Sequence, residues 1–132
     1  MPRSVAMGLS ADGRLQYFAP LCPGEQVTSV QVLDYATHRV LWEASSPVKS
    51  IREGGRITVG ASEEFEQVKV PLVSPLPDSL GLELSFDGRV TGVQASRRAI
   101  SSDMAGSDTV LTDLGEKMKE ADFRARTVQE VC

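Results

Sequence analysis

Two Asp-Gly pairs, Asp12-Gly13 and Asp87-Gly88, each lie between short runs in which apolar and polar residues alternate. This arrangement is a strong signal for a β-hairpin, because Asp and Gly tolerate the positive φ angles that hairpin turns need. Other short strand-like runs separate the two pairs. The sequence therefore predicts a small antiparallel all-β domain.

The first hairpin is predicted to have a three-residue loop, Ala11-Asp12-Gly13. This loop pairs Leu9 with Leu15. It also pairs Met7 with Tyr17, so that most of the larger apolar groups share one face. We expect the glycine of the loop to adopt the left-handed conformation of a bulge.

The second hairpin is predicted to turn through Asp87-Gly88 alone, as a two-residue type I′ loop. Such a loop places Leu82 opposite Val93 and Leu84 opposite Thr91. Apolar and polar residues alternate along residues 80–86, which indicates a strand with one buried and one solvent-exposed face.

The strongest strand signal is at residues 27–33, where both faces carry apolar groups, so this strand is expected to be central or covered on both sides. Residues 45–55 are predicted to be a loop with room for a short edge strand at Val48 and Ile51. The other predicted strands include residues 40–44, 57–59, 65–72 and 109–111. The expected core is Val5, Met7, Tyr17, Val30, Val32, Val40, Trp42, Ile57, Val68, Val70, Leu82, Leu84, Phe86 and Val93.

The period of the apolar residues changes near Asp113, and spacings of three and four residues predict an amphipathic helix from about residue 117 to 130. Asp113 and Glu116 resemble a capping box. The apolar stripe is formed by Leu111, Leu114, Met118, Ala121, Ala125, Val128 and Cys132. Docking of this stripe on the sandwich is favoured over self-association, because most helical stability comes from packing one face. The chain is thus divided into a sandwich at 1–112 and a packed helix at 113–132, within a single domain.

The chain has 132 residues, of which 41% are hydrophobic and 24% charged, with a net charge of −4, as is ordinary for a soluble globular protein. Its densest basic patch is Arg97-Arg98, so nucleic-acid binding is not expected. No run approaches the roughly 18 apolar residues of a membrane span. The N-terminus does not resemble a signal peptide, which predicts a cytoplasmic protein or a trimmed exported one.

The two cysteines, Cys22 and Cys132, leave two interpretations open. A disulfide between them would close a loop of about 110 residues and add up to ~4–5 kcal/mol of stability in the chain-entropy model. Two free thiols would be the default in a reducing cytosol. The disulfide is slightly favoured, because a terminal cysteine has little structural purpose alone, and it would imply export.

No catalytic, cofactor-binding or metal site is predicted. The single histidine, His38, lies in a predicted turn, where a solvated residue is far more common than a base or ligand. Asp103, Asp108 and Asp113 lack the spacing of a calcium loop. Cys22 has no adjacent cation in sequence that would lower its pKa and make it a nucleophile.

The segments Leu21-Cys22-Pro23-Gly24-Glu25-Gln26-Val27-Thr28-Ser29-Val30 and Leu41-Trp42, and the acidic segment that leads from Glu120 to Val131-Cys132, resemble small β-sandwich proteins of high-GC actinobacteria whose function is unknown. The resemblance implies an immunoglobulin- or fibronectin-like sandwich, with Cys22 and Cys132 near each other. It implies no activity. The terminal position of Cys132 excludes the mid-chain disulfide of true immunoglobulin domains.

The sequence thus predicts a seven- or eight-stranded antiparallel sandwich with a C-terminal α-helix. The first functional hypothesis is a non-catalytic interaction or structural module that presents loops or a sheet edge to a protein partner or to itself. The alternative is a small-molecule-binding protein, with its site between the sheets or under the helix. A structural domain of a phage or envelope assembly is a third possibility.

Overall fold

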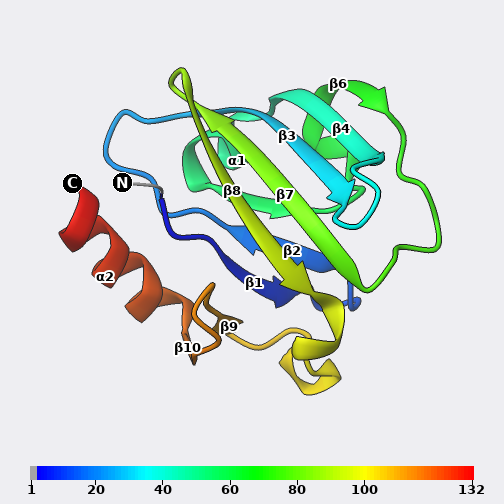
Figure 1. Ribbon diagram of the computed structural model, residues 1–132. Coiled ribbons are helices and arrows are strands. Elements are labelled where there is room, and N and C mark those ends of the chain that lie inside the picture. Colours follow the sequence, from blue (N-terminus) through cyan, green and yellow to red (C-terminus); the bar gives the residue numbers. More distant parts are fainter. Residues whose placement is uncertain (1–2) are drawn as a thin grey trace.

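Two antiparallel β-sheets of five strands each face one another in the computed structural model, which describes residues 3–132 (Figure 1). Sheet A has the order β10-β9-β1-β2-β5 and sheet B the order β6-β4-β3-β7-β8. The strands of sheet A are β1 (Ala6–Leu9), β2 (Leu15–Phe18), β5 (Arg56–Thr58), β9 (Thr109–Leu111) and β10 (Lys117–Lys119). Those of sheet B are β3 (Val27–Asp34), β4 (Val40–Pro47), β6 (Phe65–Val70), β7 (Ser79–Phe86) and β8 (Arg89–Ser96).

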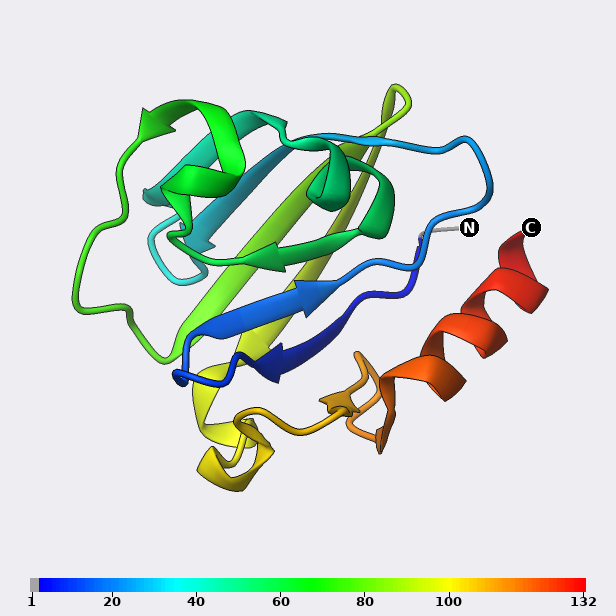
Figure 2. The same cartoon turned by 180° about the vertical axis from the view of Figure 1, so that it is seen from behind.

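The helices are short and lie outside the two sheets (Figure 2). They are the α-helices α1 (Lys49–Gly54) and α2 (Glu120–Val131) and the 3₁₀ turns η1 (Ser62–Glu64), η2 (Arg97–Ala99) and η3 (Ser102–Met104). The two-sheet antiparallel architecture confirms the predicted sandwich, although the described residues form ten strands rather than seven or eight.

Both predicted hairpins are confirmed in loop length and in register. In the first, Leu9 lies opposite Leu15, and Gly13 has a φ of 84°. In the second, Leu82 lies opposite Val93. The turn residues of the second hairpin both have positive φ angles, 46° at position 87 and 76° at position 88, as a type I′ turn requires.

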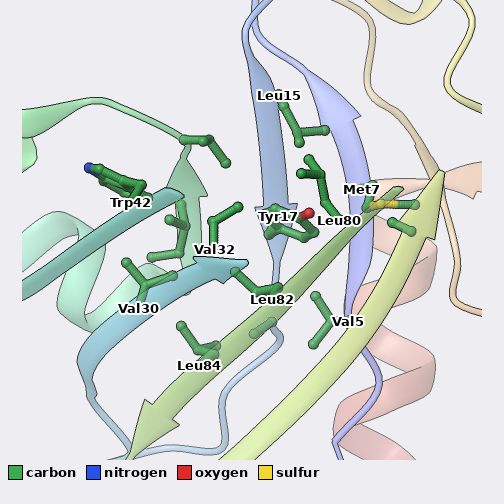
Figure 3. Packing of buried hydrophobic residues seen from close by; sticks show 14 of the residues in the cluster. Val5, Met7, Leu15, Tyr17, Val30, Val32, Trp42, Leu80, Leu82 and Leu84 are labelled. Carbon is green, nitrogen blue, oxygen red and sulfur yellow. The ribbon is translucent and has the colours of Figure 1, made fainter. Parts of the chain in front are cut away.

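The core lies between the sheets, and Trp42 is fully buried in it (Figure 3). The Trp42 ring meets that of Phe65 edge-on, with 5.5 Å between the ring centroids, a favoured geometry for aromatic pairs. Ten of the fourteen predicted core residues are buried. The other four are half-buried because they lie on edge strands or at the start of a strand; they are Val40, Val68, Val70 and Val93.

The edge strand expected near Val48 and Ile51 is wrong, because this segment forms the helix α1. Ile51 is buried, and Gly55 ends the helix with a φ of 72° and donates its N–H to the carbonyl of Ile51 over 3.1 Å. A left-handed glycine is the usual end of a helix. A six-residue helix shows no apolar periodicity, which explains why the sequence did not reveal it.

The start predicted for the C-terminal helix is also wrong. Residues 117–119 form the strand β10, which pairs with β9, and α2 begins at Glu120. The proposed capping box therefore lies in the β9–β10 turn, where Thr112 receives hydrogen bonds from the backbone N–H groups of Leu114 and Glu116. Asp113 and Glu116 are turn residues and do not cap a helix.

The helix α2 packs on the protein, but through a face other than the predicted stripe. Phe123 and Thr127 are buried, whereas Ala121 and Ala125 are exposed and Leu114 is 78% exposed. Phe123 packs in a second apolar cluster with Ala6, Phe18 and Val110, with Met118 at its margin. Burial of one aromatic side chain, that of Phe123, thus determines which face of α2 packs on the sheet, rather than the regular stripe that includes two alanines.

Candidate functional site

The predicted disulfide residues come together although they lie 110 positions apart. Cys22, in the loop between β2 and β3, is bonded to Cys132 at the end of α2, with 5.6 Å between the Cα atoms. The two ends of the described chain lie close together at this side of the molecule (Figure 1). The disulfide fastens α2 to the β2–β3 loop.

A buried arginine orders the same loop. Both terminal nitrogens of Arg3 donate hydrogen bonds to the carboxylate of Glu25, over 2.6 and 3.0 Å. One of them also donates to the carbonyl of Pro20 over 2.8 Å. Its guanidinium lies 4.8 Å from the ring centre of Phe86. Hydrogen bonds from Arg3 lower the pKa of Glu25. Arg3 and Glu25 satisfy each other's charge, so their role is structural.

The other polar residues considered from the sequence, His38, Asp103, Asp108 and Asp113, are all exposed. His38 lies in the β3–β4 turn, exposed and with a φ of 62°, and its ring centre is 6.5 Å from that of Tyr35. Within residues 3–132, no group of three or more His, Cys, Asp and Glu side chains could hold a metal ion. None of the helices in that range is long and apolar enough to cross a membrane.

Exposed sheet edges are the feature that best distinguishes one surface of this protein from another. Free edge strands invite pairing with another chain, and proteins usually blunt them with short length, charge, proline or bulges. Three of the four edges carry such protection. The strands β5 and β10 have three residues each, and β10 carries Lys117 and Lys119. The strand β6 carries Glu66 and Lys69, is bulged against β4 and is followed by Pro71.

The fourth edge, β8, has none of these features between its ends. It runs for eight residues in unbroken register with β7, and residues 90–96 include no charge and no proline. Val90 is 66% exposed. Within the described part of the chain, β7 is the only strand that pairs with β8, so the outer row of its backbone groups is open to a further strand.

The ends of β8 are positively charged. Arg89 begins the strand and forms no close ion pair within residues 3–132, although its charge contributes to lowering the pKa of Glu25. Arg97 and Arg98 follow its other end, where Arg98 lies 3.6 Å from the carboxylate of Asp78. An uncharged edge is thus bounded by cations.

A shallow hollow of about 280 Å³ adjoins β8 on the outer face of sheet B. Its floor includes Gly81 on β7 and Gly92 on β8, which lack side chains. Tyr35, 47% exposed, and Leu33 form part of its wall. The hollow could therefore hold an apolar side chain of a strand paired with β8.

Comparison of this chain with protein families, with curated proteins and with solved structures found no match. The open edge was not identified from the sequence, although residues 90–96 showed the relevant signal, a strand without charge or proline. Which strand lies at the edge of a sheet depends on the pairing of distant segments, and no local pattern carries that information.

Proposed function

We propose that this protein is a non-catalytic interaction module that binds an extended segment of a partner protein along β8. The observation that supports the proposal is the contrast among the edges, since β8 alone combines length, regular register and absence of protective residues between its ends. An added strand would gain affinity from main-chain hydrogen bonds and specificity from pockets for alternate side chains.

The charges at the ends of β8 favour a different protein over a second copy of this chain. In an antiparallel pair of strands, two directly opposite residues form either a hydrogen-bonded pair or a non-hydrogen-bonded pair, and the two types alternate along the strand. A symmetric pair of identical strands must therefore be centred on a residue that faces its own copy. Two self-pairing registers overlap β8 equally well, over residues 89–95 or 90–96. The first places Gly92 opposite Gly92, which have no side chains to pair, and the second places Val93 opposite Val93 and Arg89 opposite Arg97 of the second copy. Like charges that face each other across strands are destabilising, and this pair occurs at both ends.

The same charges describe the partner segment. It is extended, about as long as β8, and carries acidic side chains near both ends, where they approach Arg89 and Arg97. A large apolar side chain in its middle stands over Gly92 and enters the hollow beside Tyr35. Aromatic side chains suit such a position, because they bury much area at low entropic cost.

A displayed library of random linear peptides, selected on the intact oxidised protein, tests this function. We expect enriched peptides with an apolar centre and acidic ends, and we expect the bound peptide to slow amide exchange within residues 90–96. Arg89→Glu should weaken binding about tenfold through charge repulsion. The matched control is Lys69→Glu on β6, the opposite edge of the same sheet, which should leave binding unchanged.

Two results would contradict the proposal. In the first, selected peptides protect amides elsewhere and leave β8 unchanged. In the second, β8 amides of the protein alone become protected as its concentration rises, with a dimer in analytical ultracentrifugation, which would replace the partner by a second copy.

Export to an oxidising compartment is part of the same proposal, and the Cys22–Cys132 disulfide supports it, because such bonds persist mainly outside the cytosol. Classification with immunoglobulin- or fibronectin-like sandwiches, and kinship with the actinobacterial sandwich proteins, are likewise proposals. Their support is the pair of facing antiparallel sheets.

A further inference from the structure

A second hollow, of about 310 Å³, opens between the sheets at one end of the sandwich. The β1–β2 turn and the connector from β6 to β7 come together at this end (Figure 2), and the segment after β8 also lines the hollow. Its apolar wall is formed by Leu9, Leu15, Val59, Leu72, Leu76 and Ile100. Its volume falls at the lower end of the range for small-ligand pockets, and its lining is largely apolar, as is usual for them.

The charged groups of this hollow are all of one sign. Arg14 and Arg97 line it together with the hydroxyl-bearing Ser102, and no carboxylate does, although the chain as a whole has an excess of acidic residues. Arg14 already lies 3.1 Å from a carboxylate oxygen of Asp12 and 3.8 Å from one of Glu63. It is therefore largely neutralised.

Arg97 differs from Arg14 in forming no close ion pair among the described residues, although its charge contributes to lowering the pKa of the nearby Asp78. Its guanidinium donates to the backbone carbonyl of Leu76 over 2.7 Å. This bond leaves the remaining guanidinium N–H groups free. A guanidinium so placed can accept a carboxylate in a two-pronged hydrogen-bonded pair.

We propose that this hollow binds a medium-chain alkyl carboxylate, with the chain among the leucines and the carboxylate on Arg97. The apolar wall favours the chain, and the unpaired cation at the rim selects an anion over a neutral or cationic head group. The hollow shares Arg97 with the end of β8, but its apolar wall is formed by other residues than those of the β8 edge, so the absence of one kind of binding would not exclude the other.

Titration of the intact oxidised protein with octanoate, followed by methyl NMR, tests the proposal. Octanol and octylammonium serve as neutral and cationic probes of the same chain length. We expect saturable shifts of Leu76 and Ile100 methyl groups, with octanoate binding about tenfold more tightly than octylammonium. Arg97→Gln should remove this preference while octanol binding is unchanged.

Arg98→Gln is the matched control, because the adjacent arginine loses the same charge but faces Asp78 and does not line the hollow. Octanoate affinity should be unchanged in this variant. Ile100→Trp, which fills the hollow, should abolish binding of octanoate and octanol alike. Equal affinity for octanoate and octylammonium, equal loss in the two arginine variants, or shifts that do not saturate would overturn the proposal.

Discussion

The two sheets face the same core but are held together in different ways. Four strands of sheet B, β3, β4, β7 and β8, have eight residues each, whereas no strand of sheet A exceeds four. Long neighbouring strands supply their own ladders and cross-strand side-chain pairs. Sheet B is therefore stabilised mainly by contacts within itself.

Sheet A depends on links from outside its own ladders. Phe123 of α2 packs against its outer face, and Arg124 donates to the carbonyl of Gly54 over 2.9 Å. The disulfide holds the far end of α2, and Arg3 holds the segment that enters β1. One half of this sandwich is therefore stabilised mainly by its own strand pairs, and the other by a few long-range contacts.

Removal of the disulfide should have the largest effect. In Cys22→Ser combined with Cys132→Ser, the free energy of unfolding should fall by up to about 4 kcal/mol, because the unfolded chain regains the freedom of a loop that spans 110 positions. Urea unfolding measures the loss. Amide exchange should accelerate in α2 and β9 well before it does in β3 and β7. Equal acceleration in both sheets would remove the distinction drawn between them.

Loss of the buried ion pair should come next. Glu25→Gln should lower the free energy of unfolding by about 2 kcal/mol, since Arg3 would keep its buried position but lose its charged acceptor. The matched control is Glu43→Gln on sheet B, where the partner Lys69 is 3.7 Å away and 79% exposed. That exposed pair should contribute less than about 1 kcal/mol. Similar losses in the two variants would mean that the buried pair of Glu25 with Arg3 stabilises the fold no more than an exposed pair does.

The pH dependence of the free energy of unfolding should reveal the contribution of the Arg3–Glu25 pair. Hydrogen bonds from Arg3 place the pKa of Glu25 in the folded protein below its value in the unfolded chain. The pair therefore contributes its full stability above the unfolded pKa of about 4.3, and the contribution is lost as the pH falls through the folded pKa. Urea midpoints measured between neutral and acidic pH should fall less steeply in Glu25→Gln than in the wild type. Parallel curves would count against this assignment.

The sequence predicts sheet B better than it predicts the C-terminal region that packs on sheet A. The Asp-Gly turns and the alternation of residues 80–86 predict the β7–β8 hairpin to the residue, because local turn geometry fixes register. The C-terminal region is misjudged because β10 is three residues long and acquires its conformation only by pairing with β9. Phe123 lies off the regular apolar stripe, and its burial depends on the cluster around Phe18, which is distant in sequence.

The candidate site is predictable only in part, for a related reason. The strand that contains residues 90–96 follows from the hairpin, but its position at an edge requires the order of all five strands of sheet B. The pairing of Cys22 with Cys132 was one of two open interpretations, since two cysteines alone do not reveal the redox state. The cation of the second hollow was noticed only as part of a basic dipeptide.

The smallest expected effect concerns two buried hydroxyls, one in each sheet. Tyr17 of β2 lies among apolar side chains such as Leu80 and Leu82 (Figure 3). Its hydroxyl oxygen is buried without a hydrogen-bond partner among the described residues, and burial raises its pKa. Thr91 of β8 is buried as well, but it donates to the carbonyl of Arg3 over 2.8 Å.

These two hydroxyls should respond to removal with opposite signs. Tyr17→Phe should raise the free energy of unfolding by about 1 kcal/mol, because an unpaired buried polar group costs free energy that the phenyl ring avoids. Thr91→Val should lower it by about 1 kcal/mol, because the carbonyl of Arg3 loses its donor. Urea unfolding of both variants measures the two changes. If Tyr17→Phe also destabilises, its hydroxyl has a partner in solution, such as a buried water, and sheet A has a polar link beyond the disulfide and Arg3.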